Sequence, residues 1–214
     1  MRFIYGRSLW YPILLQVKGK KTVNAVVTEI EKKGSLHFSH SNYKGLVLVG
    51  LKQEKTLEVW GQNVSGEHDL IATYPFTAYS GTLGPKLQEG DRQIPEGIYR
   101  IEYLNPNSSY HLSMKLDYPN EFDKAMGKQD SRERLGYDIF IHGKAVTIGC
   151  IPIGDAAIEK LFYMVSKIGR SNVRVILSPY DMRKLERSLD IPHIDWEDQL
   201  YDQIKSALSE IQEN

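Results

Sequence analysis

Short runs of strand-forming residues, separated by polar and turn-forming residues, recur through most of this chain and limit the folds open to it. The runs lie at residues 46–49, 56–60, 70–79, 98–104, 110–116, 137–141 and 172–177. The polar residues 52–55 between the first two runs predict a β-hairpin. We also expect a strand at residues 11–17. These runs favour a β-rich core.

Helical patterns flank these runs. We expect helices at residues 22–30, 119–126, 155–168 and 196–211. In the first, valine and isoleucine recur at the spacing of one helix face. In the third, Asp155 is the expected N-cap and Gly169 the C-cap. The expected fold class is therefore mainly β with appended helices (α+β).

No internal repeat or long linker divides the 214 residues, a length that suits one or two compact domains. We divide the chain into an N-terminal strand and helix extension at 1–45, a main domain at 46–180 and a C-terminal helical extension at 181–214.

Composition excludes several classes of protein. The 27 basic and 27 acidic residues cancel, so the charge that attracts a protein to nucleic acid is missing. No apolar run approaches the roughly 20 residues of a membrane-spanning helix. The only cysteine, Cys150, excludes an internal disulfide and a cysteine-rich zinc site.

We expect neither a metal nor an organic cofactor. The glycine-containing residues 81–84 lack the Lys-Ser/Thr of a phosphate-binding loop. The remaining histidines lack metal-ligand spacing with carboxylates, so we expect them at the surface or satisfied in the core. They are His37, His40, His68, His111 and His193.

The segment 139–150 carries the clearest chemical signal. An apolar run ends at His142, and eight positions later Cys150 follows Gly149. An imidazole beside a thiol can take its proton, and the thiolate so formed is a nucleophile. We therefore expect Cys150 to be accessible, with a pKa below that of a free thiol. A purely structural cysteine is the alternative, because lone cysteines are often buried.

Backbone groups around the cysteine suit the same chemistry. The N–H groups of Ile148, Gly149 and Cys150 are expected to form an oxyanion hole, the set of donors that stabilises a negatively charged intermediate. Gly149 would also let a substrate carbonyl approach the backbone closely.

The long loop at residues 81–97 is expected to border the cleft, because long loops in compact domains are often functional. Lys86 at its middle could meet a substrate carboxylate, or it could simply be solvated. Tyr118, Asn120 and Asp123 could line the same cleft. Turn chemistry for Asn120 and a helix-start charge for Asp123 are the structural alternatives.

Three ordered groups of motifs lie between about residues 46 and 180. They comprise Gly84-Pro85-Lys86, Glu89-Gly90-Asp91 and residues 94–99, then residues 116–123, and finally Ile141-His142-Gly143 followed by Ile148-Gly149-Cys150. Together they resemble the motifs of the L,D-transpeptidase family with the YkuD-type catalytic domain, specifically its YafK-like branch. Many family members have Ser-His-Gly-Cys where this chain has Thr147-Ile148-Gly149-Cys150.

The resemblance implies a β-sandwich catalytic fold in which Cys150 is the nucleophile, His142 the base and the Gly143 carbonyl its orienting partner. Lys86 and Tyr118 are the expected substrate-binding residues. The implied partners are peptidoglycan stem peptides and wall-linked lipoprotein, without nucleic acid or a membrane span. The implied location is the periplasm or cell envelope, which requires an export signal that this sequence does not show.

The fate of the expected acyl-enzyme stays open. The apolar residues 151–153 after the nucleophile suggest a poor site for an acceptor's charged groups, which favours hydrolysis. An L,D-transpeptidase that forms cross-links or attaches lipoprotein is the first alternative. A non-catalytic module that binds wall peptides is the second, and a cytoplasmic thiol enzyme unrelated to the wall is the third.

Overall fold

The computed structural model describes residues 19–34, 38–185, 189–192 and 194–211. The strands are β1 (Tyr43–Leu51), β2 (Thr56–Asn63), β3 (His68–Pro75), β4 (Gly97–Ser108), β5 (His111–Leu116), β6 (Phe140–His142), β7 (Ile151–Pro152) and β8 (Val173–Ser178). The α-helices are α2 (Val23–Lys32), α3 (Glu121–Gln129), α4 (Asp155–Ile168) and α5 (Glu197–Ser209). Two 3-10 turns, η1 (His40–Asn42) and η2 (Arg170–Asn172), precede β1 and β8.

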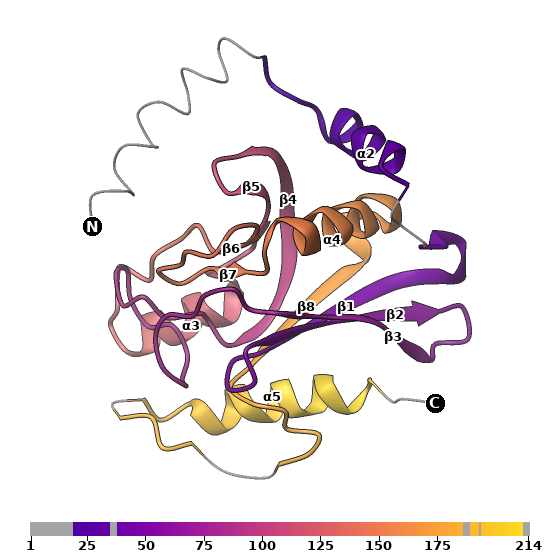
Figure 1. Ribbon diagram of the computed structural model, residues 1–214. Coiled ribbons are helices and arrows are strands. Elements are labelled where there is room, and N and C mark those ends of the chain that lie inside the picture. The colour runs from indigo at the N-terminus through magenta and orange to yellow at the C-terminus, as the bar shows by residue number, and fades with distance from the viewer. Residues whose placement is uncertain (1–18, 35–37, 186–188, 193, 212–214) are drawn as a thin grey trace.

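The described strands form one mixed sheet in the order β3-β2-β1-β8-β4-β5-β6-β7 (Figure 1). The twelve-residue β4 pairs with β8 through Gly97–Arg100 and with β5 from Ile101 onward. β1 and β8 are parallel, as are β6 and β7. β4 thus joins a five-stranded part to a part that ends in β6 and β7. The expectation of a mainly β fold with appended helices is confirmed.

Both faces of β1 are covered, which explains its unbroken apolar sequence. Leu46 and Leu48 belong to a core shared with α2 and α4, whereas Val47 and Val49 face a second core shared with α5. Figure 1 shows α2 and α4 above the sheet and α5 below it. The first core also contains residues of β5, β6 and β7, so it holds the two parts of the sheet together.

Most expected helices are present, with one correction. The helix expected at 22–30 is α2, capped by the Thr22 side chain, and Gly169 ends α4 with φ 86°. Asp155, however, is not the N-cap of α4, because Gly154 occupies that position. The Asp155 carboxylate instead accepts the backbone N–H of Lys144 at 2.8 Å.

The strand expectations need three adjustments. The run at 137–141 becomes a strand only from Phe140, and the run at 70–79 ends at Pro75. The two-residue β7 was not expected, because a run this short carries no periodicity. The strand expected at 11–17 lies outside the described residues.

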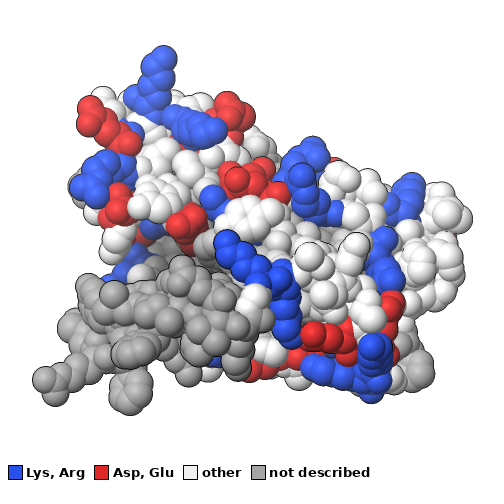
Figure 2. Space-filling model, turned by 90° about the horizontal axis from the view of Figure 1, so that it is seen from above, with Lys and Arg blue, Asp and Glu red and all other residues white. Residues whose placement is uncertain are grey.

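Within the described ranges, no helix is long and apolar enough to cross a membrane. Figure 2 shows basic and acidic side chains interspersed over the face seen from above.

Candidate active site

The pairing of β6 with β7 relates the positions of the histidine and the cysteine. Ile141 pairs with Ile151, and His142 pairs with Pro152. Continuing this register places Cys150, the residue before β7, opposite Phe140. Side chains two residues apart point to the same face of a strand. Cys150 and His142 therefore belong to the same face of this edge of the sheet.

The His142 ring is held in one tautomer. Its Nδ1 lies 2.6 Å from the carbonyl oxygen of Gly143, and a carbonyl can only accept, so Nδ1 carries the proton. Nε2 of the neutral ring is then the nitrogen that can take a proton. His142 is only 2% exposed, and burial lowers its pKa, although the Gly143 hydrogen bond opposes this shift. The imidazole is therefore a neutral base at neutral pH.

The Cys150 thiol is partly exposed, but its pKa is raised rather than lowered. Its Sγ donates to the carbonyl oxygen of Asp138 at 3.6 Å. Burial raises the pKa of Cys150 to about 11, mainly because it removes water from the thiolate, and the Asp138 charge adds to this effect. A hydrogen bond from the Phe140 backbone and the charge of Lys86 only partly oppose it. The expectation of a lowered pKa is wrong.

The turn before the cysteine is held by a side chain that the sequence did not single out. Gly149 N–H donates to Thr147 Oγ1 at 3.1 Å, and that hydroxyl donates to the Cys150 carbonyl oxygen at 2.7 Å. One of the three expected oxyanion donors is therefore engaged by Thr147 here. The oxyanion role of Ile148, Gly149 and Cys150 stays a prediction.

Gly149 has the close approach expected of it, but the approaching group belongs to the chain. Its φ is 132°, and an added Cβ would lie 3.0 Å from the carbonyl oxygen of Gln93. The long loop between β3 and β4 thus packs directly against the residue before the nucleophile. The expectation that this loop borders a catalytic cleft stays a prediction.

Lys86 lies inside this loop. It is 7% exposed, and its Nζ contacts the Asp91 carboxylate at 2.5 Å and the Gln88 carbonyl oxygen at 2.8 Å. Asp91 also accepts the N–H groups of Leu87, Gln88 and Gln93. The solvated alternative for Lys86 is therefore wrong. A substrate-binding role stays a prediction, and it would require the ammonium to leave these partners.

A buried ion pair closes the base of the same loop. Lys52 and Glu96 side chains are both 0% exposed, with Nζ and Oε1 2.8 Å apart. Lys52 also donates to the carbonyl oxygens of Gly84 and Ile94, and Glu96 accepts the Tyr201 hydroxyl of α5 at 2.9 Å. Glu96 lies in the motif at residues 94–99, but its pairing with Lys52 gave no sequence signal, because the two residues are far apart in the chain.

Tyr118, Asn120 and Asp123 have structural contacts. The Tyr118 hydroxyl is directed into the protein, where it donates to the Leu135 carbonyl oxygen at 2.8 Å. Asn120 and Asp123 form the capping box of α3, as their structural alternatives predicted. Burial raises the pKa of Asp123 to about 6. A substrate-binding role for Tyr118 stays a prediction.

The other described histidines have their own surroundings, and of these His111 lies close to Gly143. His40 is exposed, His68 is buried at the start of β3, and His111 contacts Glu159 at 2.7 Å. His37 and His193 lie outside the described residues. In the part of the chain that the structure describes, no group of three or more His, Cys, Asp or Glu side chains could hold a metal ion.

The apolar surface near the nucleophile comes from residues other than those expected. Ile151 and Ile153 are 0% and 3% exposed and belong to the core, so they do not form a wall of the site. Val146 and Ile148, on the segment leading to Cys150, are 47% and 69% exposed. The exposed apolar surface therefore comes from residues that precede Cys150 and not from those that follow it.

Comparison with known families and proteins connects this site to a defined group. A sequence model of the L,D-transpeptidase catalytic domain (YkuD) matches residues 44–176, which include both His142 and Cys150. YafK from Escherichia coli (strain K12), named as a candidate L,D-transpeptidase, is 32% identical over 136 residues. That alignment covers 61% of this chain and 52% of YafK, so the chain spans about half the length of this relative.

Solved structures share the fold. The helical cell shape determining protein Pgp2 from Campylobacter jejuni matches with a TM-score of 0.52 and 19% identity, over 89% of this chain and 78% of Pgp2. Its K307A mutant matches with a TM-score of 0.52 and 20% identity, over 88% of this chain and 61% of that one. At this identity the likeness concerns the fold alone.

Proposed function

The chain belongs to the L,D-transpeptidase family with the YkuD-type catalytic domain, and from this premise we propose that it is a cysteine-dependent enzyme that acts on peptidoglycan stem peptides. Cys150 is the nucleophile and His142 the base, and the reaction passes through an acyl-enzyme thioester. The observation that carries the proposal is the 2.6 Å contact between His142 Nδ1 and the Gly143 carbonyl, which leaves Nε2 as a proton acceptor.

The resting pair is a neutral thiol and a neutral imidazole, so proton transfer accompanies attack. His142 Nε2 takes the thiol proton while Sγ bonds to the carbonyl carbon of the scissile peptide bond. The C–N bond then breaks, and His142 gives the same proton to the leaving amine. Backbone N–H groups at Ile148 and Cys150 are the proposed donors to the oxyanion, joined by Gly149 if Thr147 releases its N–H.

We propose hydrolysis as the second step. His142 takes a proton from water, the hydroxide oxygen bonds to the thioester carbon, and the C–S bond breaks with return of the proton to the thiolate. The exposed apolar side chains of Val146 and Ile148 support this choice, because they offer nothing to hold the charged groups of an amine acceptor. Release of a wall-linked lipoprotein or trimming of a stem peptide would follow.

Transfer to an amine, which forms a cross-link or attaches a lipoprotein, is the second candidate, and the name of the YafK relative favours it. A module that binds wall peptides without turnover is the non-catalytic alternative. It gives no account of why the imidazole beside the thiol is fixed in one tautomer. Either enzymatic activity places the protein in the periplasm or cell envelope.

Intact-protein mass spectrometry with defined stem peptides tests the proposal. We expect an adduct equal in mass to the peptide minus its leaving amine, formed by the wild type and absent in Cys150→Ala. His142→Ala keeps the thiol and should acylate more slowly, whereas His40→Ala, which removes an exposed histidine, should behave as the wild type. Bound but unmodified peptide in the wild type would support the non-catalytic module.

Adding a D-amino acid or a second stem peptide to the same reaction shows whether water or an amine accepts the acyl group. Released free acid as the main product supports hydrolysis. Exchange products in excess of hydrolysis products would replace it with transfer.

A further inference from the structure

The turn of the β4–β5 hairpin packs against His142, the proposed base. The Tyr110 ring lies with its centroid 4.7 Å from that of His142, and the two planes are inclined by 37°. This separation lies in the range of favourable ring contacts. The backbone oxygen of Tyr110 is 2.7 Å from where a Cβ on Gly143 would lie. The turn therefore also lies against Gly143, whose carbonyl accepts the hydrogen bond from the imidazole.

We propose that Tyr110 is a positioning residue for His142, which keeps the imidazole in the orientation where Nδ1 donates to the Gly143 carbonyl and Nε2 stays free to take a proton. The inference rests on the proposed function, in which His142 is the base. An imidazole has two nearly equivalent orientations about its outer side-chain torsion, and a ring packed on one face restricts the change between them. Tyr110 itself is 38% exposed and touches His142 rather than the thiol.

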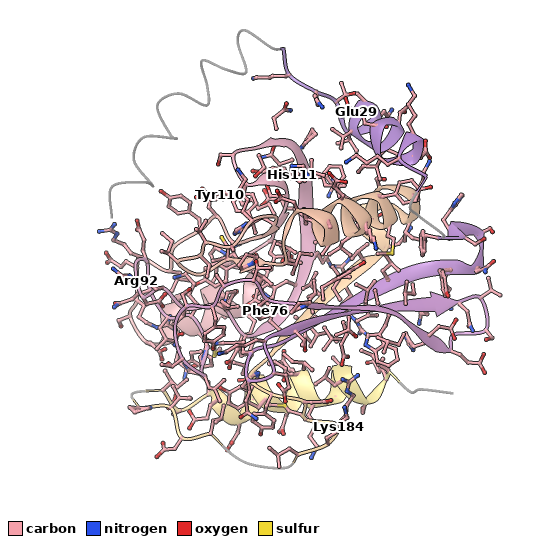
Figure 3. All side chains as sticks on the ribbon, in the orientation of Figure 1. Glu29, Phe76, Arg92, Tyr110, His111 and Lys184 are labelled. Atoms are coloured by element: carbon pink, nitrogen blue, oxygen red, sulfur yellow. The ribbon has the colours of Figure 1, made fainter. Side chains whose placement is uncertain are left out.

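The turn is anchored by polar contacts with α4 and with the segment that follows β6. His111 Nε2 lies 2.7 Å from Glu159 of α4, and Glu159 contacts Lys33, just after α2, at 2.6 Å. The Lys144 ammonium donates to the carbonyl oxygen of Ser109 at 3.2 Å. Figure 3 shows Tyr110 and His111 beside each other at this end of the hairpin. The turn is therefore a fixed support for the ring.

The N-terminal segment adds a second anchor. Lys21 N–H donates to Asn107 Oδ1, and Asn107 Nδ2 donates to the Lys21 carbonyl oxygen, both at 2.8 Å. A cavity of about 510 Å³, lined in part by Glu29, Asn107 and His111, separates α2 from the hairpin. Because this interface is incompletely packed, its specific polar contacts set where the hairpin lies. Figure 1 shows α2 and the end of the hairpin at the top of the molecule.

The test compares Tyr110→Phe, Tyr110→Leu and Tyr110→Ala with a matched control, Tyr103→Ala. Tyr103 is on the same hairpin, is 41% exposed and packs edge-on against a β6 ring, but that ring is Phe140, at 6.3 Å. Two quantities are measured: kcat and KM for the stem peptide, and the tautomer of His142 from NMR of its imidazole nitrogens.

We expect Tyr110→Phe to retain activity, because the ring is kept. Tyr110→Leu and Tyr110→Ala should lower kcat by about 10- to 100-fold with KM little changed, as misplacement of a catalytic group does. In both, the His142 nitrogen signals should shift toward a mixture of tautomers. Tyr103→Ala should change neither quantity. The leucine variant keeps an apolar side chain, so it answers the question if the alanine variant fails to fold.

The inference is overturned if folded Tyr110→Leu keeps the single His142 tautomer and the wild-type kcat, or if Tyr103→Ala has the same effect. Failure of the proposed function looks different. In that case the wild type turns over no stem peptide, while the NMR comparison still reports whether Tyr110 fixes the imidazole.

Discussion

At the scale of single residues, the nucleophile and its base are uncharged at rest. Burial acts on both in the direction that removes charge: it raises the pKa of Cys150 to about 11 and lowers that of His142. A thiolate-imidazolium pair would need the opposite shifts. The resting protein therefore contains no preformed thiolate. In the proposed reaction, the Cys150 thiol gives its proton to His142 only after the substrate is bound.

Iodoacetamide alkylation as a function of pH tests this protonation state. Because the thiol keeps its proton until the pH approaches about 11, we expect the native rate to rise steadily from pH 7 to 10 without a plateau. Mass spectrometry of the modified protein measures the rate, and the single cysteine makes the site unambiguous. His142→Ala should react more slowly at neutral pH. A plateau below pH 8 would instead indicate a preformed thiolate.

The sequence could indicate the candidate pair, His142 and Cys150, but not the charge of its members. His142 and Cys150 each lie next to a short apolar segment, and such a pattern can be recognised from neighbouring residues alone. Their pKa values depend on how much water the folded chain excludes, which spacing does not report. Tyr110 was missed for a related reason, since its contact with His142 crosses from one strand pair to another.

At the scale of elements, the loop between β3 and β4 behaves as a fixed wall. The Lys86 ammonium and the Asp91 carboxylate are turned inward, toward each other and toward the loop's own backbone. Removing Lys86 leaves the buried Asp91 carboxylate with backbone N–H donors but without its counter-ion, which is costly.

We expect Lys86→Ala to lower the free energy of unfolding by about 3–5 kcal/mol, measured by urea denaturation. Its side chain and that of Asp91 are 5% and 13% exposed. The matched control is Arg134→Ala, which removes the exposed pair of Arg134 with Glu89, where the loss should be below about 1 kcal/mol. An unchanged stability together with a raised KM would show that Lys86 serves the substrate instead.

Elements were predictable where their pattern was long. The helices α2 and α4 bury one face each, and the spacing of their apolar residues shows this directly. β6 and β7 have three and two residues, too few for any period to appear. Asp155 was misassigned because a carboxylate at a helix start can bond to a different chain segment, here Lys144 N–H, as well as to its own helix.

At the scale of the whole molecule, the C-terminal helix α5 is joined to the loop between β3 and β4 by a hydrogen bond from a tyrosine hydroxyl, in addition to the apolar packing around Leu87. Tyr201 donates to Glu96, whose carboxylate is fully buried and also binds Lys52 and the Gly84 N–H. Losing that hydroxyl leaves a buried carboxylate oxygen short of a donor.

Tyr201→Phe should therefore destabilise the protein by about 1–3 kcal/mol and speed hydrogen exchange of the backbone around residues 84–96. Mass spectrometry of the exchanged peptides measures this local effect. Tyr137→Phe is the control, because that side chain is 67% exposed. Faster exchange confined to α5 would mean that the helix and the loop are not coupled.

The order of strands in the sheet was beyond the sequence. Local runs identify strands, but the choice of neighbours depends on which faces α2, α4 and α5 cover.

The parallel pairing of β1 with β8 also sets an order of events during synthesis. Leu46 pairs with Val173, so the centre of the sheet cannot close until nearly the whole catalytic segment has left the ribosome. Closing so long a loop costs chain entropy and slows folding, to the millisecond-to-second range of chains dominated by distant contacts. Until β8 emerges, β1 can pair only with its hairpin partner β2. The helices α2 and α4, which cover the face of Leu46 and Leu48, are made before β8, whereas α5 is made after it. The face of β1 that carries Val47 and Val49 is therefore the last part of the core to be covered during synthesis.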